Sequence, residues 1–263
     1  MESEPSITER IQTLAAKILA TSPAGHDLCL IGGFRYRLLN ASCRASADID
    51  YHWEGDLDGK QAEIVAVLRK KLLPEVKRQI DYDGDVRPAA GLAAESPAVR
   101  IIEMIFYRTA EPGSRIEIPV EITSIPRLDS PIVITVGGTV FLTVSDADMI
   151  ESKIIVLLHG HFIRARDILD IFLFQDALRP DVSGRLSRKF TELSLSPHDV
   201  AQRLQRLRTN RVVHVRAIGR LLDEQVDPAV AANLRAAGGA AMVWDAVMRR
   251  LAKTLGVDWE SGP

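Results

Sequence analysis

The spacing of apolar residues changes at Ser145, and this change constrains the fold more than any other feature of the 263-residue chain. Before it, short apolar runs such as "LCLI" and "PIVITV" indicate β-strands. After it, apolar residues recur at helical spacing from "DADMIESKIIVLLH" to "AVMRRLAKTL". We therefore predict an α+β protein with a mixed-sheet half over residues 1–145 and a helical bundle over residues 146–263.

Local signals divide the first half into elements. A capping-box pattern starts a helix at "SITERIQTLAAKILA", and helical spacing over residues 58–80 is interrupted by Pro74. Residues 98–122 read as a hairpin whose turn is "TAEPGS", and a second hairpin turns at Gly137–Gly138. "DYDGDVRP" carries alternating aspartates but lacks the final glutamate of an EF-hand loop, so we expect a solvated turn rather than a calcium site.

Two acids in "ADIDYHW" are the first candidates for chemistry. Asp48 and Asp50 are separated by one residue in a predicted strand, so their side chains point to the same side about 7 Å apart. Carboxylates at this distance can share divalent ions, and Mg²⁺ (or Mn²⁺) prefers such oxygen ligands together with substrate phosphates. The alternative is a solvated strand face.

A glycine pair precedes these acids. Gly32 and Gly33 follow the apolar run "LCLI" and precede a predicted helix, so bare backbone there can approach phosphate oxygens and offer N–H donors. Arg44 and Ser46 add a cation and a hydroxyl between the glycines and the acids. The combination predicts a nucleotide site, whereas the glycines alone indicate only a turn.

A third carboxylate is expected on a neighbouring strand, because two-metal sites usually draw ligands from more than one element. In "IEIPVEIT" the candidates are Glu117 and Glu121, which share a face. We prefer Glu121, and a cross-strand salt bridge is the alternative for both.

The formal charge of −2 conceals an uneven distribution. Residues 1–159 hold 17 Lys/Arg against 23 Asp/Glu, whereas residues 160–220 hold 12 against 6. The basic segment is compatible with RNA contact or with solvated helix faces, and Arg203, Arg208 and Arg211 are the candidate RNA contacts. Two cysteines and no apolar run near the roughly 20 residues of a membrane span favour a reducing, cytoplasmic setting without a membrane.

At this point the chain resembles a known family. The glycine pair, "RASADID" and a later single acid are similar to the polymerase β-like nucleotidyltransferases, and "DADMIESKIIVLLHGHFIRARDILDIF" resembles two helical motifs of the AbiEii toxin family, which includes the MenT-type toxins. The resemblance covers about residues 28–177. It implies a polymerase β-like fold for the sheet half and site residues from both halves.

The resemblance assigns a role to each matching position. It implies that Asp48, Asp50 and Glu121 bind the metal, and that Gly32, Gly33 and Ser46 hold the triphosphate with Arg44 nearby. It also implies that Lys153 reaches the nucleotide phosphates. Asp167, with Arg166 beside it, would contact nucleotide or acceptor. Phe34 departs from the pattern, because the family usually carries Ser or Thr directly after the glycines.

The function implied is transfer of a nucleoside monophosphate from a triphosphate to RNA, such as the 3′ end of tRNA, with pyrophosphate released and a cognate antitoxin as partner. Two alternatives remain open. One is transfer to a small, aminoglycoside-like hydroxyl compound. The other, suggested by Phe34, is a catalytically weak nucleotide-binding protein.

Overall fold

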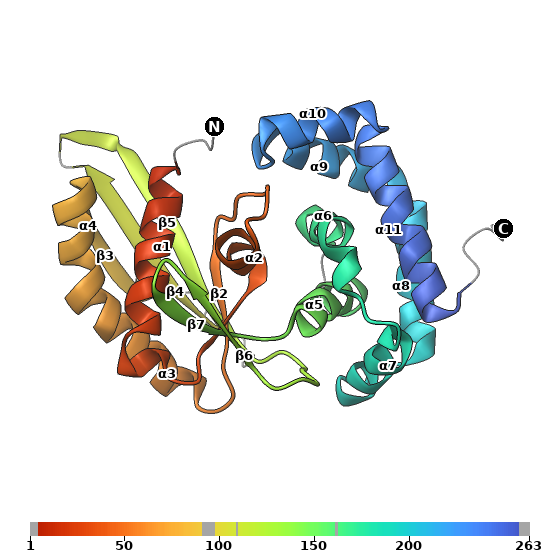
Figure 1. Ribbon diagram of the computed structural model, residues 1–263, viewed down its shortest axis with the longest axis horizontal. Helices are drawn as coiled ribbons and strands as arrows, with labels where there is room; N and C mark the ends of the chain where they lie inside the picture. Colours follow the sequence, from red (N-terminus) through yellow and green to blue (C-terminus); the bar gives the residue numbers. More distant parts are fainter. Residues whose placement is uncertain (1–4, 91–97, 109, 161–162, 258–263) are drawn as a thin grey trace. The chain divides into compact units, whose positions relative to one another are not determined.

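The computed structural model describes residues 5–90, 98–108, 110–160 and 163–257 (Figure 1). The chain forms two compact units. The sheet unit comprises Met1–Ile125 and Pro131–Val144, and the helical unit comprises Pro126–Ser130 and Ser145–Pro263. The five residues 126–130, which lie between two strands of the sheet unit in sequence, therefore pack with the helices.

The sheet unit follows the predicted alternation of strands and helices. Its elements are α1 (Ile7–Ala20), η1 (Pro23–Gly25), β1 (Cys29–Ile31), α2 (Gly32–Asn40), β2 (Ile49–His52), α3 (Leu57–Val67), η2 (Leu68–Leu72), α4 (Leu73–Ile80), β3 (Asp83–Pro88), β4 (Val99–Arg108), β5 (Glu111–Thr123), β6 (Ile132–Val136) and β7 (Thr139–Thr143). The capping box predicted for α1 is present, because the Ser6 side chain accepts a hydrogen bond from the Glu9 amide. Pro74 lies at the start of α4, and the π-helical η2 joins that helix to α3.

The seven strands form one mixed sheet in the order β3-β4-β5-β2-β1-β7-β6. The pairs β1–β7 and β2–β5 are parallel and the remaining pairs are antiparallel. The β6–β7 turn at Gly137–Gly138 has positive φ at both residues, as a tight hairpin of this type requires. The mixed sheet with its helices confirms the predicted α+β class.

Two local predictions were wrong. "DYDGDVRP" is not a turn, because Asp83–Pro88 forms the edge strand β3 and pairs with β4. In the β4–β5 hairpin, the strand already begins at Glu111, so Pro112 and Gly113 lie within β5 rather than in the turn. A proline is tolerated in a strand where its missing N–H does not interrupt the ladder.

The main core lies on one face of the sheet. α1, α3 and α4 cover that face (Figure 1), and Phe34 of α2 also belongs to this core. On β2, Ile49 and Tyr51 belong to this core, so the alternation of a strand turns Asp50 to the opposite face. Apolar burial thereby decides which way the acids point.

The helical unit contains α5 (Asp146–His159), α6 (Ala165–Phe174), η4 (Gln175–Ala177), α7 (Val182–Glu192), α8 (Pro197–Thr209), α9 (Arg211–Glu224), α10 (Pro228–Ala236) and α11 (Gly239–Leu255). Its interior includes the fully buried Trp244, which stacks on His214 with ring centroids 5.0 Å apart. Of these helices, α7 was not predicted. In the described part of the chain, no helix has the length and apolar character needed to cross a membrane.

Candidate active site

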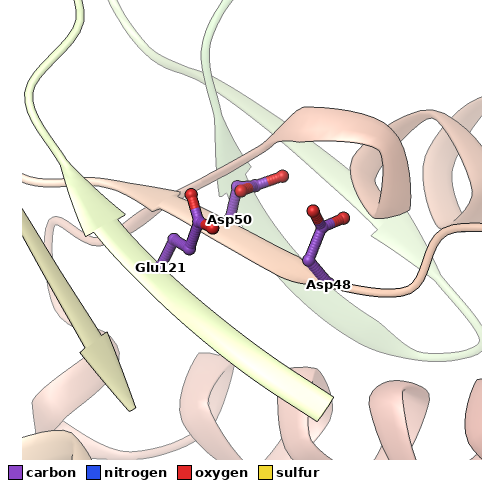
Figure 2. A group of neighbouring side chains, drawn as sticks. All are labelled: Asp48, Asp50 and Glu121. Atoms are coloured by element: carbon purple, nitrogen blue, oxygen red, sulfur yellow. The ribbon is translucent and has the colours of Figure 1, made fainter. Parts of the chain in front are cut away.

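The three predicted metal ligands come together in the sheet unit. One carboxylate oxygen from each of Asp48, Asp50 and Glu121 lies within 4.8 Å of the other two, and we call these residues the acid cluster. Figure 2 shows the three side chains rising from the same side of two neighbouring strands. Three carboxylates so close repel one another unless a cation lies between them, so the donor set fits a divalent metal ion that prefers oxygen ligands.

Strand pairing brings the third acid to the first two. β2 and β5 are parallel, and their register places Asp50 opposite Glu121. Glu117 lies four residues earlier on β5, is exposed and pairs with Arg115 at 2.7 Å. The geometry therefore selects Glu121 from the two candidates that the sequence offered.

The glycine pair lies against the acids and leaves little room for side chains. Ile31 pairs with Asp50, so the chain enters α2 beside that carboxylate. A Cβ on Gly32, which has φ of +77°, would be 1.7 Å from Asp50 Oδ2. A Cβ on Gly33 would be 2.4 Å from the guanidinium of Arg44 and 2.8 Å from Ser46 Oγ. Bare backbone is thus a steric requirement at Gly32, and a Cβ at Gly33 would displace the side chains of Arg44 and Ser46.

The arginine and serine predicted beside the glycines are both buried. Arg44 is 3% exposed, and its Nη1 donates to the Ala45 carbonyl at 2.8 Å. Ser46 Oγ donates to Asp48 Oδ1 at 2.7 Å. The Ser46 hydroxyl therefore orients the carboxylate of Asp48, a predicted metal ligand. The sequence did not indicate this contact.

Phe34 packs in the main core and is 1% exposed. Its ring therefore does not replace the expected hydroxyl at the glycine pair, because it points into the apolar interior. Ser46 provides a hydroxyl next to Gly33 instead.

The remaining predicted residues lie in the helical unit. Lys153 Nζ on α5 is 3.1 Å from Asp167 Oδ1 and 3.2 Å from Asp170 Oδ2, both on α6. Arg164 donates to Asp167 at 2.7 Å, and Arg166 is the next residue to Asp167 on the same helix. Burial opposes ionisation of Asp167, but the charges of Lys153 and Arg164 outweigh it and hold the pKa of this carboxyl below its usual value.

Arg203 and Arg211, both proposed for RNA contact, make contacts within the helical unit. Arg203 donates to the carbonyls of Leu157 and Gly160, and so caps the C-terminal end of α5. Arg211 forms a two-pronged ion pair with Asp245, with distances of 3.1 and 2.8 Å. Arg208 lies on α8 between them and is partly exposed.

A second group of charges was missed by the sequence. Arg185 and Lys189 on α7 meet acids from α5 and from residues 126–130, forming what we call the α5–α7 ion network: Asp129, Asp148, Glu151, Arg185 and Lys189. The Asp148 carboxylate also accepts the amides of Leu128 and Asp129. Burial opposes ionisation of Asp148, but Lys189 and these amides hold its pKa below the usual value. The network fixes residues 126–130 to the start of α5.

A further missed residue is Gln12 on α1. Its side chain is 1% exposed and donates to the carbonyls of Ser46 and Asp48 at 3.0 and 3.3 Å. The available signal was a polar residue on the apolar face of a helix, since the other buried residues of α1 are Ile11, Ala15, Ala16 and Leu19.

One known protein family matches most of the chain. A family model described as nucleotidyl transferase AbiEii toxin, type IV TA system, matches residues 12–239. No curated protein matches the chain. The match spans both units and every predicted site residue.

Solved structures with a similar fold include two from Helicobacter pylori and one from Mycobacterium tuberculosis. JHP933 from Helicobacter pylori superposes with a TM-score of 0.50 at 17% identity, covering 95% of this chain and 92% of that one. A second H. pylori structure, described as a putative nucleotidyltransferase, gives 0.49 at 17% identity with 94% and 95% covered. The MenT4 nucleotidyltransferase toxin from Mycobacterium tuberculosis gives 0.46 at 15% identity, with 74% and 72% covered. At these identities the likeness to JHP933 shows the fold alone.

Proposed function

The chain belongs to the AbiEii nucleotidyltransferase toxin family, and from this premise we propose that it is a metal-dependent toxin that transfers a nucleoside monophosphate to RNA. The metal requirement is supported by the acid cluster, in which one carboxylate oxygen of each residue lies within 4.8 Å of the other two. The neighbouring Gly32 and Gly33 leave no room for a Cβ unless nearby side chains move. Mg²⁺ or Mn²⁺ bound there would neutralise charge on the triphosphate and on the attacking oxygen.

The chain's own residues would supply positioning and proton transfer. The backbone at Gly32 and Gly33, at the N-terminal end of α2, offers N–H donors to the triphosphate, and Arg44 and Ser46 lie against the same glycines. The acceptor hydroxyl would attack the α-phosphorus while the bond between that phosphorus and the α,β-bridging oxygen breaks, and pyrophosphate leaves. Glu121 would take the proton from that hydroxyl.

The roles implied for the helical unit belong to the same proposal. Lys153 would reach the nucleotide phosphates, and Asp167 with Arg166 would contact nucleotide or acceptor. The contacts of Lys153 with Asp167 and Asp170 support an additional role, because a lysine between two buried carboxylates fixes their orientation.

The proposed acceptor is the 3′ end of tRNA, with a cytoplasmic site of action and a cognate antitoxin as the partner. The decisive experiment incubates the protein with total tRNA, Mg²⁺ and each α-labelled triphosphate in turn. We expect label on RNA with at least one nucleotide, loss of label with a chelator, and loss with tRNA whose 3′ diol has been oxidised by periodate. Label that persists on oxidised tRNA would contradict a 3′-end acceptor, and label only on an added aminoglycoside would favour the small-molecule alternative.

Contact with RNA through α8 is tested at Arg208, whose side chain is partly exposed on that helix. We expect Arg208→Gln to weaken transfer to RNA and to reduce its dependence on salt concentration, since one phosphate contact is lost. Arg249→Gln, an exposed arginine on α11, is the matched charge control. Equal effects of the two variants would remove the case for α8.

A further inference from the structure

The two aspartates of the acid cluster are held in different ways. Asp50 lies inside β2 and is fixed on both sides by strand pairing, with Ile31 of β1 and Glu121 of β5. Asp48 precedes the strand, which begins at Ile49, and has no place in the described strand register. A ligand on irregular backbone needs another restraint to keep its carboxylate in position.

Gln12 provides contacts of that kind. Its amide nitrogen donates to the Ser46 and Asp48 carbonyls, which lie on either side of Ala47. The Ser46 hydroxyl then donates to the Asp48 carboxylate at 2.7 Å. One buried side chain on α1 is therefore connected through two backbone carbonyls and one hydroxyl to a single carboxylate of the cluster.

The location of Gln12 makes a purely stabilising role a poor explanation. It interrupts the apolar face that α1 presents to the core, between Ile11 and Ala15, where an apolar residue would pack without any polar group to satisfy. A buried amide is retained at such a position when its hydrogen bonds fix something specific. The thing fixed here is the backbone of residues 46–48.

We propose that Gln12 is a positioning residue for the metal site, acting through the Ser46–Asp48 backbone to hold the Asp48 carboxylate toward Asp50 and Glu121. The proposal rests on the metal-binding function assigned above. Gln12 fixes the backbone at Asp48 by hydrogen bonds, as strand pairing fixes the backbone at Asp50. Its removal therefore weakens metal binding more than it weakens the fold.

The test measures Mn²⁺ binding to the full chain without nucleotide, by the loss of the free-ion signal in electron paramagnetic resonance. Gln12→Met keeps the length and bulk of the side chain and removes both hydrogen bonds. Gln12→Asn keeps the donor but is one methylene shorter, and it carries the test if the methionine variant does not fold. We expect Mn²⁺ affinity to fall about tenfold for Gln12→Met, equivalent to about 1.4 kcal/mol, with a smaller fall for Gln12→Asn.

Leu19→Ala is the matched control, because Leu19 is a fully buried apolar residue of the same helix that belongs to the core. It should lower the melting temperature and leave Mn²⁺ affinity unchanged. The inference is overturned if the folded Gln12 variants bind Mn²⁺ as wild type does, or if Leu19→Ala weakens binding equally. Failure of the wild-type chain itself to bind Mn²⁺ would instead refute the proposed metal site, so the two failures are distinguishable.

Discussion

The two units of the molecule treat carboxylates in opposite ways. In the sheet unit, the acid cluster gathers three carboxylates within 4.8 Å of one another. In the helical unit, the acids of the α5–α7 ion network each face Arg185 or Lys189, at distances of 2.5 to 3.0 Å. Like charges gathered in one cluster favour binding of a cation, whereas the opposite charges of the ion network neutralise one another.

The acid cluster has the charge pattern expected of a chemical site, and the ion network has the pattern expected of a structural one. The acid cluster concentrates negative charge, which costs stability without a bound cation and which a metal ion can use. The ion network is buried and neutralised, and it joins α7, α5 and residues 126–130. Substitutions should therefore affect activity in the first unit and stability in the second.

The largest effect is expected from Asp50→Asn in the acid cluster. Transfer should fall by about a thousandfold or more, or about 4 kcal/mol of transition-state stabilisation, because a carboxylate that would hold the charge-neutralising metal ion is lost. In metal-free buffer the melting temperature should rise or stay the same, since one like charge is removed. Single-turnover transfer and thermal melts measure the two quantities, and a strongly destabilised Asp50→Asn would show that this carboxylate is structural.

Breaking the ion network should have the reverse pattern. Arg185→Met leaves three carboxylates at the network with fewer partners, and loss of one partner from a buried pair costs about 3–5 kcal/mol. Activity per folded molecule should change far less than in Asp50→Asn. Urea unfolding gives the free energy, and Arg179→Met, a more exposed arginine that also approaches Asp129, is the control with a small expected loss.

The sequence predicted what short-range periodicity can specify. Strand alternation predicted Asp48 and Asp50 on one side, although β2 begins only at Ile49, and the steric need for glycine at position 32 follows from the approach of Asp50 to the backbone. The choice between Glu117 and Glu121 required the long-range pairing of β2 with β5, because residues that share a face of one strand cannot be distinguished by spacing. The fold class, set by the change at residue 145, needed no such information.

The residues that were missed act through partners far away in the chain. Gln12 bonds to carbonyls more than thirty residues later, and Arg185 reaches acids on α5 and in residues 126–130. A lone glutamine in an amphipathic helix and an arginine in the polar stretch "VSGRLSRKFTE" have ordinary explanations as surface residues. Burial of a polar side chain is decided by tertiary packing, so the sequence carries little signal for it.

Addition of Mn²⁺ should have a smaller effect on stability, and this effect should distinguish the acid cluster from the ion network. Mn²⁺ at 100 times its dissociation constant should raise the free energy of unfolding of wild type by about 2.7 kcal/mol, because the ion binds the folded acid cluster and not the unfolded chain. Asp148→Asn in the ion network should keep this increase, and Asp50→Asn should lose it. The increase is read from unfolding curves with and without the ion, and an equal increase in all three proteins would place the metal elsewhere.

The smallest effect concerns His214, where the helical unit buries a titratable group in its neutral form. Burial, and secondarily the charge of Arg203, hold the pKa of His214 below its usual value. The unfolded chain therefore takes up a proton near pH 6.5 before the folded chain does, so stability is intact above that pH and decreases as pH falls through the lowered pKa. His214→Phe keeps a ring against Trp244 and removes the titration. The melting temperature of wild type relative to His214→Phe should decrease between pH 7.5 and pH 5, and a constant difference across that range would show that His214 is not held neutral by the fold.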